Sequence, residues 1–145
     1  MILDIGCGEK PVGDINLDIS RHVQIGPKSG IVKSKCNIIA DALYLPFRDK
    51  SIEILYSSHC IEHVKSPCGF VKECERVAIQ RIILKCPSKW MIGNRGNRLH
   101  KYTITIPWLR AYGFTVQVSW LHYPGWSPFR ILRADELLQA IKELQ

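Results

Sequence analysis

Residues Ile2–Gly8, with the sequence ILDIGCG, decide the fold class of this chain. The run Met1–Ile5 is mostly apolar, which is typical of a buried strand, and the glycines after it predict a tight turn. Glycine at such a turn lets the backbone come close to a ligand. The segment therefore predicts a strand that leads into a ligand-binding loop, and by itself it fits any nucleotide cofactor.

Short β-type runs continue along the chain, separated by loops or helical segments. Strands are expected at Asp14–Ile19, Cys36–Ala40, Ser51–Ser57, Arg81–Cys86, Phe114–His122 and Phe129–Leu132. Strands that alternate with helices favour parallel pairing in an α/β sheet. The sequence contains no repeat, low-complexity tract or linker, so residues 1–145 are predicted to form a single domain.

Three segments have the features of helices. Ser66 and Pro67 predict the start of the first, because serine caps a helix and proline fits its first turn. The second is expected to start near Thr103 or Thr105. The third is Ala134–Leu144, whose apolar residues have the spacing of an amphipathic helix. The predicted buried face of this last helix consists of Leu137, Leu138, Ile141 and Leu144.

The composition is that of a globular protein, with 46% hydrophobic and 23% charged residues. No apolar run approaches the roughly 18–20 residues that span a bilayer. Asp4 and Glu9 interrupt the N-terminus, which is therefore unlike a signal peptide. We expect a cytoplasmic protein that makes no contact with a membrane.

The formal net charge of +7 favours an anionic partner, for example RNA. Basic residues gather in the predicted loop Trp90–Lys101, which is expected to act as a cationic flap beside the site. The alternative is that the basic residues form solvated faces without a partner.

Two acidic residues follow predicted strands at positions suited to a nucleotide cofactor. Asp18 ends the second strand, where a carboxylate can accept hydrogen bonds from both ribose hydroxyls. Asp41 follows the third strand and precedes Leu43 and Leu45. That arrangement suits an adenine ring, because the carboxylate could accept a hydrogen bond from the exocyclic amine while the leucines flank the ring.

Four segments together resemble a known family. They are ILDIGCG at residues 2–8, NLDIS at 16–20, DALYLPF at 41–47 and SIEILYSSHCIEHV at 51–64. Their order and spacing resemble the class I S-adenosylmethionine-dependent methyltransferases, most of all the methyltransferase type 11 family, over residues 1–115. The resemblance implies an α/β fold with a Rossmann-like, doubly wound, mostly parallel sheet. It also implies an enzyme with S-adenosylmethionine as its cofactor.

The resemblance implies roles for individual residues. The glycine loop would wrap the methionine part of the cofactor, and Asp4 would orient either this loop or the amino group of the cofactor. Asp18 and its neighbour Ile19 would hold the ribose. Asp41 and the Ala42 amide would bind adenine, and Ser58 would lie beside the sulfonium. The loop residues are Gly6, Cys7 and Gly8.

His59 is the candidate catalytic residue, because it is the nearest plausible base if the acceptor must lose a proton; His100 and His63 are the next candidates. Local packing or capping is the alternative role for this histidine. His59, Glu62 and His63 also form an H-x-x-E-H pattern like that of some zinc enzymes. No sensible third ligand is evident in the sequence, and the six cysteines include no C-x-x-C pair, so no metal is expected.

Cys86 occupies a position at which some RNA methyltransferases carry a nucleophilic cysteine. No second Pro-Cys motif accompanies it, so a buried, inert thiol is the expectation.

Two features depart from the family pattern. The chain starts at the first strand, so the fold is expected to be truncated at the N-terminus and to lack the helices that cover the cofactor. Only residues 9–14 separate Gly8 from Ile15, so the first crossover helix is expected to be replaced by an extended loop.

Two other functions stay open. An incomplete domain could bind S-adenosylmethionine without catalysis or act as the partner subunit of a heteromeric methylase. A homo-oligomer or a second subunit would then cover the open cofactor site. An NAD-dependent oxidoreductase shares the glycine turn and Asp18 but gives the Asp41 segment no role.

Overall fold

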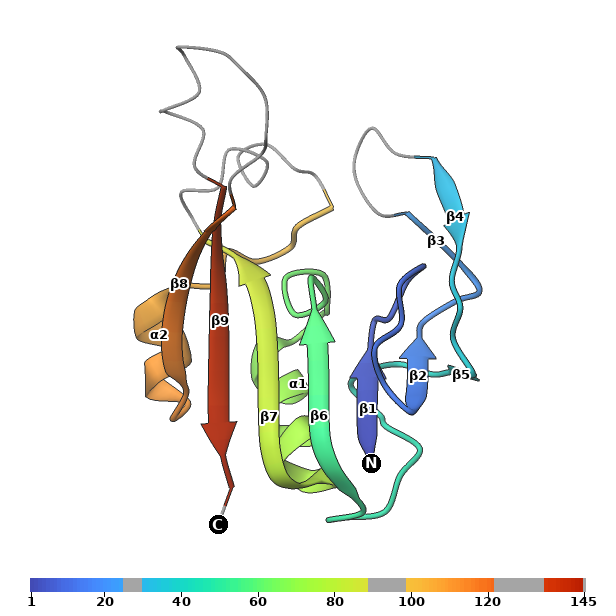
Figure 1. Ribbon diagram of the computed structural model, residues 1–145, viewed down its shortest axis with the longest axis horizontal. Coiled ribbons are helices and arrows are strands. Elements are labelled where there is room, and N and C mark those ends of the chain that lie inside the picture. Colours follow the sequence, from blue (N-terminus) through green and yellow to red (C-terminus); the bar gives the residue numbers. More distant parts are fainter. Residues whose placement is uncertain (25–29, 89–98, 122–134, 145) are drawn as a thin grey trace.

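A computed structural model describes residues 1–24, 30–88, 99–121 and 135–144. Its centre is a seven-stranded sheet with the order β5-β2-β1-β6-β7-β9-β8 (Figure 1). The strand bounds are β1 Ile2–Ile5, β2 Ile15–Asp18, β5 Ile38–Ile39, β6 Ile52–Ser58, β7 Ala78–Pro87, β8 Thr115–Leu121 and β9 Asp135–Glu143. A separate antiparallel pair joins β3 (His22–Gln24) to β4 (Ile31–Lys33), and the sequence did not indicate it.

The pairing is mostly parallel, as the sequence predicts. Strand β1 pairs in parallel with β2 and β6, β2 with β5, and β6 with β7. Only β9 runs antiparallel within this sheet of the described chain, between β7 and β8. The Rossmann-like, mostly parallel α/β architecture is therefore confirmed.

The prediction of a closing helix at Ala134–Leu144 is wrong, because the described part of this segment forms strand β9. Seven residue pairs join it to β7, from Arg81 opposite Glu143 to Pro87 opposite Leu137. Alternate residues of β9 then face opposite sides of the sheet. Leu138 is buried on one side, whereas Leu137 and Ile141 are half-buried on the other. The spacing of the leucines resembled a helical period, but the ladder with β7 decides the conformation.

Both other predicted helices are confirmed, with their caps. Helix α1 spans Pro67–Val77, and the Ser66 hydroxyl accepts a hydrogen bond from the Gly69 amide at 3.1 Å. Helix α2 spans Ile106–Ala111, and the Thr105 hydroxyl accepts from the Trp108 amide at 3.4 Å. Neither of these helices is long and apolar enough to cross a membrane. The predicted turn Tyr123–Phe129 and strand Phe129–Leu132 lie outside the described residues.

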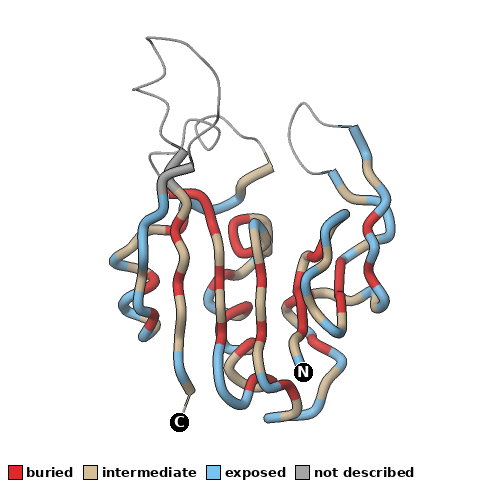
Figure 2. Tube along the Cα trace, viewed as in Figure 1, coloured by how far each residue is buried: buried red, intermediate tan, exposed pale blue. Residues whose placement is uncertain are grey.

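The core lies between α1 and the face of the sheet that it covers (Figures 1 and 2). Phe70 and Val71 of the helix are fully buried, as are Leu55 and Ile82 of the sheet. Cys86 is also fully buried, and burial raises the pKa of its thiol to about 12. This agrees with the expectation of an inert cysteine, because the thiolate is the nucleophile. The core thereby fixes the strand ends that build the site.

No helix connects β1 to β2, as the short spacing predicts, because residues 6–14 are all described and form turns and bends. The connection is held by polar contacts instead. Asp4 accepts a hydrogen bond from the Val12 amide at 3.0 Å, and the Gly13 amide donates to the Asn16 side chain at 3.1 Å. The extended link therefore returns the chain to the start of β2 without a crossover helix.

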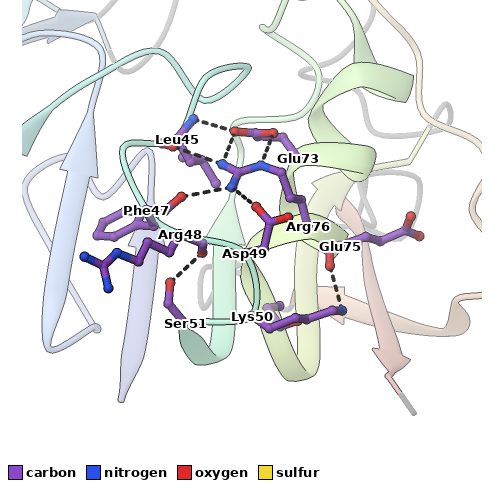
Figure 3. A network of polar contacts seen from close by, with 10 residues as sticks. Leu45, Phe47, Arg48, Asp49, Lys50, Ser51, Glu73, Glu75 and Arg76 are labelled. Carbon is purple, nitrogen blue, oxygen red and sulfur yellow. Dashed lines mark hydrogen bonds and ion pairs between the residues drawn. The ribbon is translucent and has the colours of Figure 1, made fainter.

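An arginine on α1 fixes the connection between β5 and β6 (Figure 3). The Arg76 guanidinium donates to Glu73 at 2.6 Å, to Asp49 at 2.6 Å and to the Phe47 carbonyl at 2.9 Å. Glu73 also accepts from the Leu45 amide at 2.8 Å. The hydrogen bonds from Arg76 hold the pKa of the Glu73 carboxyl below its ordinary value.

The stability contribution of Glu73 should depend on pH. Because its pKa is lower in the folded protein, the contribution is present above the unfolded value of about 4.5 and disappears as the pH falls through the folded value. We expect Glu73→Gln to cost about 1–2 kcal/mol at pH 7 and less at pH 3, measured by urea unfolding. Glu143→Gln, which removes the exposed partner of Arg81, is the control and should cost less than about 0.5 kcal/mol at either pH. If Glu73→Gln lowers the free energy of unfolding by the same amount at both pH values, the ionised Glu73 carboxylate is not the group that stabilises this connection.

Candidate cofactor and acceptor site

A cavity of about 960 Å³ opens at the carboxyl ends of β1, β2 and β6. Ligands bind at this edge in parallel α/β sheets, and the volume is at the upper end of the range for small-molecule sites. Most of the residues singled out from the sequence border it. They are Asp4, Gly6, Cys7, Gly8, Asp18, Ile19, Ser58 and His59.

The glycine loop adopts a backbone that other residues rarely take. Gly6 and Gly8 have φ angles of 73° and 54°. The Gly6 amide donates to the Leu17 carbonyl at 2.8 Å, which fixes the loop against β2. A Cβ atom on Gly6 would lie 2.9 Å from the Cβ of Cys60, whereas one on Gly8 would have nothing within 4 Å. The loop is therefore packed on one side and open at Gly8, where a ligand can approach the backbone.

Asp18 holds this loop in place. It is only 6% exposed, and its carboxylate accepts from the Gly8 amide at 3.0 Å, the Ser34 hydroxyl at 2.9 Å and the Ile19 amide at 2.9 Å. A carboxylate has about four acceptor positions, so one remains after these three bonds. Asp18 can thus organise the loop and still accept from a ribose hydroxyl. Ser34 was missed from the sequence, because it lies outside every motif and is brought here by the chain after β4.

Asp4 is 2% exposed at the floor of the cavity. Burial is the main reason that the pKa of its carboxyl is raised, and the hydrogen bond from Val12 opposes the rise. Through this bond Asp4 joins β1 to the extended link. Its role in orienting the glycine loop stays a prediction.

Asp41 and Ala42 are not among the residues that border the cavity. The Asp41 carboxylate accepts from the Leu43 amide at 2.9 Å, and its carbonyl accepts from the Tyr44 amide at 2.9 Å, so it forms a turn. Ala42 is 8% exposed and belongs to the core. Their roles at the adenine ring stay predictions.

His59 lies just beyond β6 with a φ angle of 53°. Its amide donates to the Lys85 carbonyl at 2.8 Å, which stabilises this left-handed conformation at the mouth of the cavity. The side chain is 45% exposed, and its Nδ1 lies 3.4 Å from Oε1 of Glu62. Non-glycine residues with positive φ gather at functional sites. His59 is placed where a base for the acceptor would be needed, but no contact tests that role.

Two more histidines border the same side of the cavity, on segments far apart in the sequence. The rings of His63 and His100 pack edge to face, with centroids 4.8 Å apart. Burial lowers the pKa of His100. The Glu62 carbonyl accepts from the Lys101 amide at 2.9 Å and so ties the two segments together. Of the predicted cationic flap Trp90–Lys101, residues 90–98 lie outside the described part of the chain.

Comparison with known proteins decides the family. Residues 3–81, more than half of the chain, match the methyltransferase domain of type 11. The chain belongs to this family. It is 30% identical over 95 residues to ajmaline N-methyltransferase from Rauvolfia serpentina, an alignment that covers 53% of this chain and 32% of that enzyme. The chain thus spans about one third of the length of this curated methyltransferase relative.

Solved methyltransferase structures share the fold over nearly the whole chain. A SAM-dependent methyltransferase from Archaeoglobus fulgidus is 18% identical, with a TM-score of 0.63 over 99% of this chain and 85% of its own. Another from Methanosarcina mazei is 17% identical, with a TM-score of 0.63 and coverages of 98% and 91%. A putative methyltransferase from Haloferax volcanii, in complex with the Trm112 methyltransferase activator, is 13% identical, with a TM-score of 0.62 and coverages of 97% and 80%.

The family and the fold imply S-adenosylmethionine as the cofactor, and the residues present fit it. Gly8 leaves open space where a side chain would lie, while its amide and carbonyl are held by Asp18 and Lys35. Asp18 retains an acceptor position at the end of β2. The cavity has room for a nucleoside-sized ligand and for part of an acceptor. These features agree with the resemblance on which the cofactor assignment was first based.

Proposed function

We propose that this methyltransferase domain is an active enzyme that transfers a methyl group to a nucleophilic atom held in the cavity. Bound S-adenosylmethionine supplies an electrophilic methyl group on a positively charged sulfur. The observation that carries the proposal is that Gly8, Asp18 and His59 border one cavity at the carboxyl edge of the sheet. Methyl transfer is an in-line displacement, so the protein mainly has to align the two reactants.

The residues of the chain divide the task by position. The amino-acid part of the cofactor would lie against the loop at Gly8, where no side chain stands in the way, and Asp18 would accept from a ribose hydroxyl. Ser58, which ends β6, and His59, which follows it, would face the acceptor. If the acceptor atom carries a proton that must leave, an imidazole nitrogen of His59 would take it.

An anionic acceptor, with RNA as the first candidate, fits the charge of the chain. Lys10 and Lys101 border the cavity, and the whole sequence carries a net charge of +7. A second subunit or a second copy of the chain could complete the acceptor side. The neighbour from Haloferax volcanii, which forms a complex with a methyltransferase activator, supports testing that arrangement.

The test is an assay of methyl transfer from labelled S-adenosylmethionine to RNA, to protein and to small amines or alcohols. Two products are measured, S-adenosylhomocysteine and the labelled acceptor. We expect turnover with at least one acceptor class. His59→Asn should lower turnover by about 100-fold, because general base catalysis typically contributes that much, while cofactor affinity stays unchanged. A parent protein that binds the cofactor but turns over none of the acceptors, alone or with a partner subunit, would support the silent binding module instead.

A further inference from the structure

A buried carboxyl group beside the cavity lacks hydrogen-bond partners. Glu62 has a side chain that is 1% exposed, and within the described part of the chain neither of its oxygens has a hydrogen-bond partner. Two imidazole nitrogens lie within 4.0 Å of its Oε1 atom, Nδ1 of His59 at 3.4 Å and Nε2 of His63 at 4.0 Å. Burying such a group without a partner is costly, so the arrangement calls for a positively charged partner.

The hydrogen bond of His63 shows which of its nitrogens faces that partner. Nδ1 lies 2.9 Å from the Leu99 carbonyl oxygen. A carbonyl can only accept, so Nδ1 carries the proton and donates it. Nε2 is then the nitrogen on the Glu62 side, at a separation too long for a direct hydrogen bond. Histidines that bind metals usually donate the N–H of their other ring nitrogen to a carbonyl or carboxylate, and the bond from His63 to Leu99 has this form. Nε2 of His63 is then the nitrogen available to an ion beside Glu62.

His100 supplies the third donor that the sequence did not reveal. Glu62, His63 and His100 each offer one ligand atom, and these three atoms lie within 4.8 Å of one another. Ligand atoms around a tetrahedral Zn²⁺ are about 3.4 Å apart, given bond lengths of about 2.1 Å. Small side-chain rotations would therefore close the site. The backbone bond from Lys101 to Glu62 already holds the two segments together.

We propose that Glu62, His63 and His100 bind a divalent first-row transition metal ion, with Zn²⁺ as the best match to two imidazoles and a carboxylate. Three protein ligands leave a tetrahedral ion one open position. His63 and His100 border the cavity, so this position would be accessible from it. An oxygen or nitrogen of the methyl acceptor would occupy the position, a part of the proposal that rests on the proposed function. The expectation of no metal, drawn from the missing third ligand, is replaced by this proposal.

Metal binding is measured without cofactor or acceptor, so that its outcome is independent of methyl transfer. The full chain is stripped with a chelator and titrated with Co²⁺, whose visible absorption reports its coordination, and with Zn²⁺ by calorimetry. We expect one equivalent to bind, and at least a tenfold weaker affinity for Glu62→Gln, His63→Ala and His100→Ala. His22→Ala, which removes an exposed histidine of β3, should bind the ions like the parent.

A parent that binds no ion would overturn the proposal, as would Glu62→Gln and His63→Ala variants that bind like the parent. Strong near-ultraviolet absorption from Co²⁺–thiolate bonds would also overturn it, because cysteines would then be the ligands. Thermal melting covers the case in which a variant is unstable. At the same Zn²⁺ concentration, the melting temperature of the parent should rise by more than that of Glu62→Gln, and equal shifts for the two proteins would contradict the assigned ligands.

Discussion

Gly13→Ala is expected to destabilise the protein by at least about 3 kcal/mol, the upper range for overpacking a tight site. A Cβ atom at this position would lie 2.7 Å from the Ile15 carbonyl oxygen, 2.8 Å from the Asp4 amide nitrogen and 2.9 Å from the Ile2 carbonyl oxygen. All three are backbone atoms of β1 and β2, and they cannot move away without disturbing the pairing of the two strands. The effect follows from the missing crossover helix, because the extended link passes directly against β1.

Urea unfolding followed by circular dichroism measures this effect. Gly30→Ala is the matched control, because a Cβ atom there would have nothing within 4 Å, and we expect a change below about 0.5 kcal/mol. If Gly13→Ala unfolds at the same urea concentration as Gly30→Ala, the path of the link between β1 and β2 is wrong.

Asp18→Ala is expected to weaken the binding of S-adenosylmethionine by about 1–3 kcal/mol, because a ribose hydroxyl loses its charged acceptor. The structure gives a second reason to expect a loss of affinity at the upper end of this range. Without the carboxylate, the amide of Gly8 and the hydroxyl of Ser34 lose their shared acceptor, so the loop loses its fixed position.

Two variants separate these contributions, with affinities from calorimetry. Ser34→Ala removes one contact to the carboxylate but keeps the acceptor for ribose, so we expect a smaller loss than for Asp18→Ala. Asp41→Ala should also lose less, since its carboxylate already serves a turn. An Asp18→Ala variant that binds the cofactor like the parent would place the ribose elsewhere.

Local sequence signals predicted the elements whose conformation is decided locally. The glycine turn after β1 and the Ser66 cap of α1 each depend on neighbouring residues, and both are confirmed. Strand β9 was predicted as a helix because the pattern of its leucines also fits a helical period. Its pairing with β7, more than fifty residues earlier, decides the matter, and no local pattern reports such a contact.

The site shows the same division between local and distant information. The motifs placed Asp18 and His59 at the cavity because Asp18 ends β2 and His59 directly follows β6. Ser34 and His100 could not be found in this way, because only the folded chain brings them to Asp18 and His63. The carboxylate of Glu62 was visible within the H-x-x-E-H pattern, but its burial without a hydrogen-bond partner was not.

Calorimetric titration of the parent protein with S-adenosylmethionine tests the central claim most directly. We predict saturable binding of one equivalent with a micromolar dissociation constant, similar binding of S-adenosylhomocysteine, and no heat with NADH. Both S-adenosyl compounds should also raise the melting temperature, because they bind only the folded protein. The absence of any heat or melting shift with either compound, up to millimolar concentration, would contradict the assignment of the cavity as the cofactor site.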